Sequence, residues 1–84
     1  MKEITFKDQL ELTGMETVRE ARAILNSLKG LNDYDITAIT GINNKVIEFN
    51  CYNMKTNAAY YGHLDNIDLI VSLDYAGDID DLEW

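Results

Sequence analysis

The chain has 84 residues, a single cysteine and a net charge of −8 at pH 7. This length suits one domain over residues 1–84, and a lone cysteine excludes an internal disulfide, which is typical of a reducing compartment. No apolar run is suitable for a signal peptide or a membrane span, so we expect a soluble, cytoplasmic protein that does not bind membranes.

The charge is divided unevenly along the chain. Residues 1–55 contain all seven lysines and arginines together with eight acids, whereas residues 56–84 contain seven acids and neither basic residue. A strongly negative region repels nucleic acids and membranes and attracts basic protein surfaces. We therefore expect no direct binding to nucleic acid. The alternative to attraction of a basic partner is that the acidity only keeps a small protein soluble.

A strand and a helix are the first predicted elements. Apolar and polar residues alternate over Ile4–Leu12, with Asp8 as the exception on the apolar side, and this is the period of a half-buried strand. Thr13 and Glu16 have the spacing of a capping box, and they predict a helix over 14–29 that Gly30 ends. The apolar stripe of this helix consists of Met15, Val18, Ala21, Ile24, Leu25 and Leu28.

The clearest hairpin pattern lies between Tyr34 and Tyr52, where two runs of β-branched and aromatic residues flank Asn43-Asn44. Asparagine tolerates positive φ, so this pair favours a two-residue turn. The apolar face then holds the cross-strand pairs Ile42 with Lys45, Thr40 with Ile47, Ala38 with Phe49, and Ile36 with Cys51. The pair Ile39 with Glu48 falls on the half-exposed face. A change of one residue in loop length would invert the two faces.

Two more strands are predicted after this hairpin. A turn-like cluster at 53–57 precedes a strand over Ala58–Leu64, for which a short helix is the alternative. In a strand, Tyr60 and Tyr61 point to opposite faces. The next strand, over Ile67–Tyr75, places Leu69, Val71, Leu73 and Tyr75 on one face, toward the helix.

The end of the chain is a short acidic segment. Ala76-Gly77 is expected to end the last strand, and residues 78–84 form an acidic C-terminal tail. This tail is either a frayed terminus or a short amphipathic turn docked through Trp84. The elements together predict a β-α-β-β-β-β order and an α+β fold of two layers, with one amphipathic helix packed on a mainly antiparallel sheet of four to five strands.

Catalytic and metal-binding patterns are absent from the sequence. His63 is the only histidine, and Cys51 is expected in the core, so a Cys-His pair lacks the electropositive setting that a thiolate needs. The acids after Gly77 do not have the spacing of a calcium loop, and the isolated glycines do not form a phosphate cradle. We therefore expect no enzymatic activity, no metal and no cofactor.

Acidic and aromatic residues occur together in the last third of the chain. Aromatic residues are enriched at interface hot spots, and carboxylates can take the places of phosphates on the surface of a basic partner. The predicted partner-binding residues are Tyr60, Tyr61, Asp65, Asp68, Asp74, Asp78, Asp80, Asp81, Glu83 and Trp84. The alternative is that the aromatic residues belong partly to the core and the acids are only solvated.

In size, acidity and lack of catalytic machinery, the chain resembles as a class the small inhibitors that phages and mobile elements direct against host nucleases, namely anti-CRISPR and anti-restriction proteins. This resemblance implies a noncatalytic, DNA-mimic-like protein of the host cell cytoplasm that blocks the basic nucleic-acid channel of a nuclease or effector complex. One alternative is an immunity protein or antitoxin that neutralises a basic toxin. Another is a structural module that associates with itself, as a homodimer, through an exposed strand edge.

Overall fold

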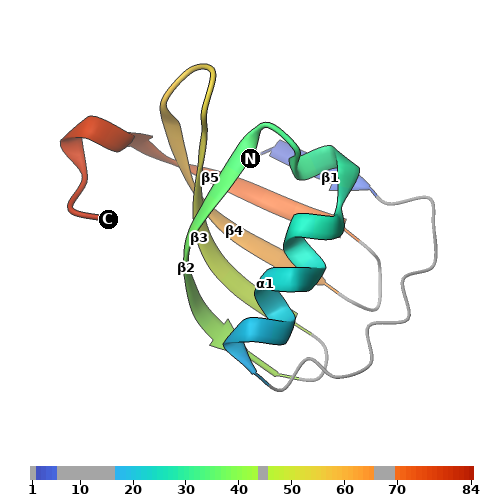
Figure 1. Cartoon of the computed structure of the whole chain (residues 1–84). Coiled ribbons are helices and arrows are strands. Elements are labelled where there is room, and N and C mark those ends of the chain that lie inside the picture. Colours follow the sequence, from blue (N-terminus) through green and yellow to red (C-terminus); the bar gives the residue numbers. More distant parts are fainter. Residues whose placement is uncertain (1, 6–16, 44–45, 66–69) are drawn as a thin grey trace.

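The structure is a computed structural model, and it describes residues 2–5, 17–43, 46–65 and 70–84. Figure 1 shows one helix lying across one face of a twisted sheet. In chain order the elements are β1 (Lys2–Thr5), α1 (Val18–Ser27), the 3-10 turn η1 (Lys29–Leu31), β2 (Tyr34–Ile42), β3 (Val46–Asn53), β4 (Ala58–Asp65), β5 (Ile70–Asp78) and the 3-10 turn η2 (Ile79–Asp81). The predicted α+β fold, with one helix on an antiparallel sheet, is confirmed.

The five strands are arranged in the order β1-β5-β4-β3-β2, and every neighbouring pair is antiparallel. Strands β2 to β5 follow one another as successive hairpins, and β1 pairs with the last of them. The helix connects the two edges of the sheet, since it follows β1 and precedes β2. Within the described residues, no helix has the length and apolar character required to cross a membrane.

The helix begins at a threonine cap and is shorter than predicted. The Thr17 side chain accepts a hydrogen bond from the Glu20 backbone N–H at 3.2 Å, which satisfies one free donor of the first turn. The predicted cap at Thr13 and Glu16 lies outside the described residues. At the other end the chain leaves the helix after Ser27 and forms η1, so Gly30 lies inside a 3-10 turn and does not itself end the helix.

One hydrophobic core fills the space between helix and sheet. Ala21, Leu25 and Leu28 are buried there, as the predicted stripe requires. Their partners from the sheet include Ile36, Ile47, Phe49, Cys51, Leu64, Val71 and Leu73. Val18 is an exception to the predicted stripe, because it lies one turn before the first buried residue and stays 53% exposed.

The β2–β3 hairpin has a wider loop than predicted. The Asn43 backbone N–H donates to the Val46 carbonyl at 3.0 Å, and the Asn43 side chain accepts from the Val46 N–H at 2.8 Å, so Ile42 pairs with Ile47. The predicted pairs of Ile42 with Lys45, Thr40 with Ile47, and Ala38 with Phe49 are therefore wrong.

Two register shifts in β2 restore the predicted pairing at the base of the hairpin. They lie between Ile36 and Ala38 and between Ile39 and Gly41, and each is a β-bulge or similar irregularity. Ile36 therefore pairs with Cys51, as predicted. The shifts also turn Ile39 to the core, where it pairs with Phe49, so the predicted pair with Glu48 is wrong.

Strands β4 and β5 follow the predicted alternation with two corrections. Ala58–Asp65 is a strand, so the helical alternative for this segment is wrong. Val71 and Leu73 are buried, but Tyr75 is 67% exposed. The last strand does not end at Ala76-Gly77 but continues to Asp78, because a register shift next to Ala59 and a Gly77 φ of 124° accommodate an irregular final stretch.

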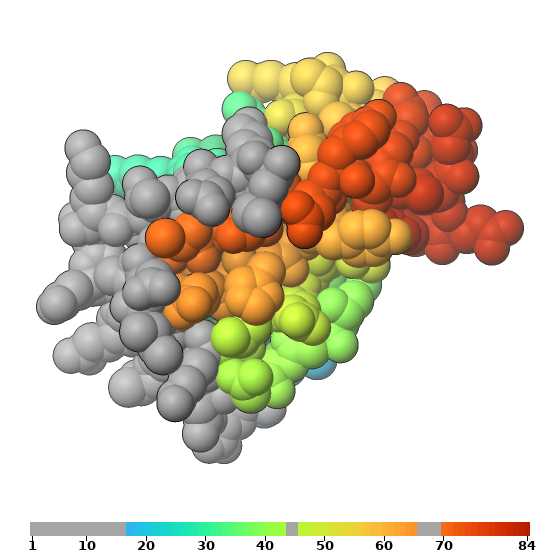
Figure 2. All heavy atoms as spheres, turned by 180° about the vertical axis from the view of Figure 1, so that it is seen from behind, coloured from blue at the N-terminus to red at the C-terminus, as the bar shows by residue number. Residues whose placement is uncertain are grey.

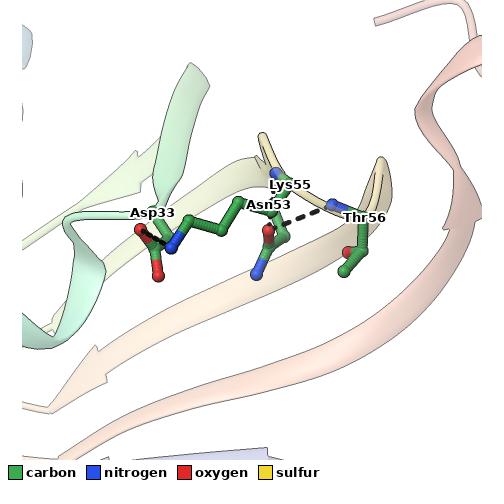
Figure 3. A network of polar contacts seen from close by, with 4 residues as sticks. All are labelled: Asp33, Asn53, Lys55 and Thr56. Atoms are coloured by element: carbon green, nitrogen blue, oxygen red, sulfur yellow. Dashed lines mark hydrogen bonds and ion pairs between the residues drawn. The ribbon is translucent and has the colours of Figure 1, made fainter.

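Side-chain hydrogen bonds hold the predicted turn between β3 and β4 (Figure 3). The Asn53 Oδ1 atom accepts from the backbone N–H groups of Lys55 at 2.8 Å and Thr56 at 3.3 Å. The Lys55 ammonium lies 3.3 Å from the Asp33 carboxylate, which joins the turn to the residues before β2. Asn57 completes the turn with a φ of 63°, a conformation that asparagine tolerates.

Candidate protein-interaction face

The sheet face opposite the helix carries polar and acidic side chains in two cross-strand rows. Asn50, Tyr61 and Asp74 are register neighbours on β3, β4 and β5, and Glu48, His63 and Ser72 form the second row. Side chains of alternate residues share one face of a strand, so these rows face away from the buried Phe49 and Leu73. We call this surface the outer face, and Figure 2 looks onto it.

A groove crosses the outer face. It has a volume of about 300 Å³, and its polar lining consists of Thr40, Glu48, Asn50, Tyr61, His63 and Asp74. The sheet residues Phe49 and Gly62 also contact it. The groove therefore collects residues from β2 to β5 that are separated along the sequence and that only the sheet brings together.

Neighbouring strands hold Glu48 in the groove. One carboxylate oxygen lies 3.7 Å from His63 Nδ1 on β4. The other would lie 3.0 Å from a Cβ atom at Gly41, its register partner on β2. Because Gly41 has no side chain, the carboxylate can lie over that strand. The irregularity beside Gly41 also places Thr40 in the lining of the groove.

Acidic residues predominate on strands β2 to β5. Strands β2 to β5 contain no lysine or arginine, whereas they contain Asp35, Glu48, Asp65, Asp74 and Asp78. The basic residues that the structure describes lie elsewhere: Lys2 in β1, Arg19 and Arg22 in α1, Lys29 in η1 and Lys55 in the β3–β4 turn.

Two of the described basic residues make contacts away from the groove. Lys55 pairs with Asp33, and Arg22 donates to the backbone carbonyl of Ile36 at 2.5 Å. For the part of the chain with described coordinates, no lysine or arginine forms an ion pair with Glu48 or Asp74. Glu48 instead contacts His63, at 3.7 Å.

The acidic C-terminal tail is docked and not frayed. Asp78 caps η2 by accepting a hydrogen bond from the Asp80 N–H at 2.9 Å, and the Ile79 N–H donates to the Asn57 carbonyl at 2.8 Å. The Trp84 ring lies 5.4 Å from the Tyr61 ring, centre to centre, at an angle of 58°. The predicted alternative of a turn docked through Trp84 is therefore the one that the structure shows.

The structure divides the ten residues predicted to bind a partner into several groups. Tyr61, Asp74 and Trp84 come together at the outer face, and Asp65 lies at the end of β4. Asp78, Asp80, Asp81 and Glu83 lie in and around η2, and Asp68 is outside the described residues.

Tyr60 lies on the face of the sheet that the helix covers. It packs against the core, and its ring lies 5.9 Å from those of both Tyr34 and Tyr75. For this residue the structure matches the alternative of a partly core aromatic residue. A partner that contacts the outer face would not reach it from that side.

Four residues of the polar lining of the groove were not among the predicted partner-binding residues: Thr40, Glu48, Asn50 and His63. The alternation of β3 places Glu48 and Asn50 on the half-exposed face, which is a usable sequence pattern. Their proximity to His63 and Asp74 depends on the register of three strands, which the residues do not specify on their own.

Cysteine and metal chemistry receive no support from the described residues. Cys51 is buried, and this burial raises the pKa of its thiol to about 12, so the thiolate is not the form present near neutral pH. No group of three or more His, Cys, Asp or Glu side chains with described coordinates is placed to hold a metal ion.

Comparison of the chain with protein-family models, with curated proteins and with solved structures finds no match. The function of the outer face is therefore argued from its geometry and charge.

Proposed function

We propose that the protein is a noncatalytic inhibitor that binds the basic nucleic-acid-binding surface of another protein, such as a host defence nuclease, and excludes DNA or RNA from it. The acids of the outer face and of the C-terminal turn would take the places of phosphates. The function belongs to the anti-CRISPR and anti-restriction class, with a phage or mobile element as the source.

The observation that carries this proposal is the charge of the outer face. Four adjacent strands present acids and the groove without a lysine or arginine, and the described basic residues lie on β1, the helix and the turns. A single-sign surface of this kind raises the rate of association with a basic partner and disfavours acidic ones. The acidic C-terminal tail adds Asp80, Asp81 and Glu83 beside the outer face, because Trp84 contacts Tyr61 on β4.

The edge strand β2 disfavours self-association through its own edge, which is one of the two edges of the sheet. An edge that pairs with a second copy presents a regular row of backbone groups, whereas β2 has two register shifts within nine residues. Irregularities of this kind on an edge strand disfavour pairing with another chain. Binding through side chains on the outer face does not require that edge.

The test is capture of a partner from a nuclease-treated host lysate on the immobilised protein at low salt, followed by elution with a salt gradient. We expect a basic nucleic-acid-binding protein that elutes steeply with salt and that can no longer bind or cleave its nucleic acid in the complex. Replacement of Asp78, Asp80 and Asp81 by Lys should abolish capture. The control is Glu20→Lys, a single charge reversal on the helix and away from the outer face. This variant should still capture the partner.

Two outcomes would reject the proposal. Capture that does not depend on salt would show that charge does not drive binding. A captured nuclease that still binds its nucleic acid in the complex would exclude occupation of that surface. Capture of a basic toxin without affinity for nucleic acid would instead support an immunity protein.

A further inference from the structure

We propose that the groove on the outer face is a receptor for one arginine side chain of the basic partner. This inference rests on the proposed function and adds a specific recognition site to it. A general acidic surface attracts any cation, whereas the groove combines shape, carboxylates and an aromatic ring at one place.

The two carboxylates come from opposite sides of the groove. Glu48 is on β3 and Asp74 is on β5, with Tyr61 and His63 of β4 between them in the register. Glu48 and Asp74 belong to neighbouring rows, so their Cα atoms are separated by two strand spacings and by two residues along the strands, or about 12 Å. A guanidinium group has donors on several sides of a planar fork, so it can bond to one carboxylate and to other acceptors of the lining at once.

Tyr61 supplies an aromatic surface beside these carboxylates. It is 54% exposed, pairs directly with Asp74 across the strands, and contacts Trp84 through its ring. An arginine side chain favours such a place, because its planar head stacks on aromatic rings while it bonds to carboxylates. A lysine ammonium is a compact, strongly hydrated charge and gains less from the same arrangement.

The position of Glu48 indicates a prepared acceptor. Its carboxylate lies between Gly41 and His63, with one oxygen 3.7 Å from His63 Nδ1. Asn50 and Thr40 supply further oxygen acceptors in the lining. Those parts of the groove with described coordinates contain no competing lysine or arginine.

The experiment uses two synthetic probes, the peptides acetyl-Gly-Arg-Gly-amide and acetyl-Gly-Lys-Gly-amide, titrated into the labelled protein at low ionic strength. Amide chemical shifts in NMR spectra locate each peptide and give its affinity. We expect saturable shifts at Glu48, Tyr61, His63 and Asp74 with the arginine peptide, and weaker binding of the lysine peptide.

Two matched variants distinguish binding in the groove from attraction to acidic residues in general. Asp74→Asn and Asp80→Asn remove the same charge, but only Asp74 lines the groove. We expect Asp74→Asn to lower the affinity for the arginine peptide about fivefold, which corresponds to the upper range measured for solvent-exposed ion pairs. Asp80→Asn should leave this affinity unchanged. Amide spectra of both variants show directly whether the fold is retained.

Three results would overturn the inference. These are equal affinity for the two peptides, shifts distributed over all acidic segments, and equal weakening by both variants. Such results leave the proposed function intact if the Lys replacements in the C-terminal turn still abolish partner capture. Loss of salt-dependent capture would instead reject the proposed function, whatever the peptides show.

Discussion

The indole of Trp84 lies against the ring of Tyr61, with ring centres 5.4 Å apart at 58°. This contact joins the last residue of the chain to the middle of β4 and brings the acidic C-terminal turn to the edge of the outer face. Tilted aromatic pairs at this distance are worth about 0.5–1.5 kcal/mol beyond their buried area. The acids of η2 are therefore positioned by a specific packing contact.

Replacement of Tyr61 by Ala should release Trp84 into water. Trp84 is the only tryptophan, so its fluorescence reports this contact alone. We expect a shift of the emission to longer wavelength and easier quenching by iodide. The control is Tyr75→Ala, which removes an even more exposed tyrosine on the other face of the sheet. Unchanged emission in the Tyr61 variant would show that the contact does not persist in solution.

Gly62 and Gly41 should differ in their tolerance of a methyl group. A Cβ atom at Gly62 would lie 2.3 Å from the buried Phe49 ring, whereas at Gly41 the nearest atom, at 3.0 Å, is a terminal carboxylate oxygen of the exposed Glu48 side chain. Overpacking in a core costs about 1–3 kcal/mol, and we expect this loss for Gly62→Ala. Gly41→Ala should change the unfolding free energy by less than about 0.5 kcal/mol.

Urea unfolding of both glycine variants, followed by circular dichroism, measures the difference. The two substitutions add the same methyl group to β4 and β2, the strands on either side of β3, so each is the control for the other. Equal stability of the two variants would contradict the close packing of Phe49 on Gly62.

The sequence predicts the fold well where one face of an element is buried. Val71 and Leu73 alternate with polar residues and are buried, and Ala21 and Leu25 lie on the stripe of the helix. These patterns succeed because burial of apolar side chains decides both the period and the side of the element that faces the core. The pair of Ile36 with Cys51 agrees with the prediction only because two register shifts compensate for the wrong pairing next to the turn.

The register of β2 could not be predicted from its residues. Thr37 and Thr40 resemble their neighbours in β propensity, and Gly41, the one local sign of a bulge, lies beside only the second of the two irregularities. The hydrogen bond from the Thr37 hydroxyl to the Asn50 carbonyl, at 3.2 Å, forms only after the strands have paired. The groove depends on this register, because Thr40 and Glu48 reach it from different strands.

The prediction for Tyr75 failed for a related reason. Alternation placed it correctly on the same face as Leu73, but it could not show how far along the sheet the helix extends. Tyr75 contacts Tyr60 by its ring and otherwise remains in water. The burial of an apolar position depends on tertiary packing, and alternation along one strand does not specify which residues cover it.

Asn53 should contribute more stability than Lys55 in the β3–β4 turn. The Asn53 side chain accepts two backbone hydrogen bonds, and Asn53→Ala removes both, at a cost of about 1 kcal/mol. Lys55 forms an ion pair with Asp33 in which the side chains are 74% and 52% exposed, so Lys55→Ala should cost less than about 0.5 kcal/mol. Midpoints of urea unfolding give the comparison, and the reverse order would contradict the role of Asn53.

Cys51 should make the stability of the protein fall in alkaline solution. Burial raises the pKa of the native thiol to about 12, whereas a thiol in the unfolded chain has a pKa of about 8.5. The native state therefore keeps a proton that the unfolded state releases, and the contribution of Cys51 is full below about pH 8.5 and is lost as the pH rises toward 12.

Unfolding free energies measured from pH 7 to 11 would show this loss, with a limiting slope of about 1.4 kcal/mol per pH unit from this group. Tyrosines and lysines titrate in the same range, so the control is Cys51→Ala. That variant should be less stable at pH 7 because it leaves a cavity, and its stability should fall less steeply with pH. A native thiol that reacts at pH 8 with a disulfide reagent as fast as the unfolded chain does would contradict this burial.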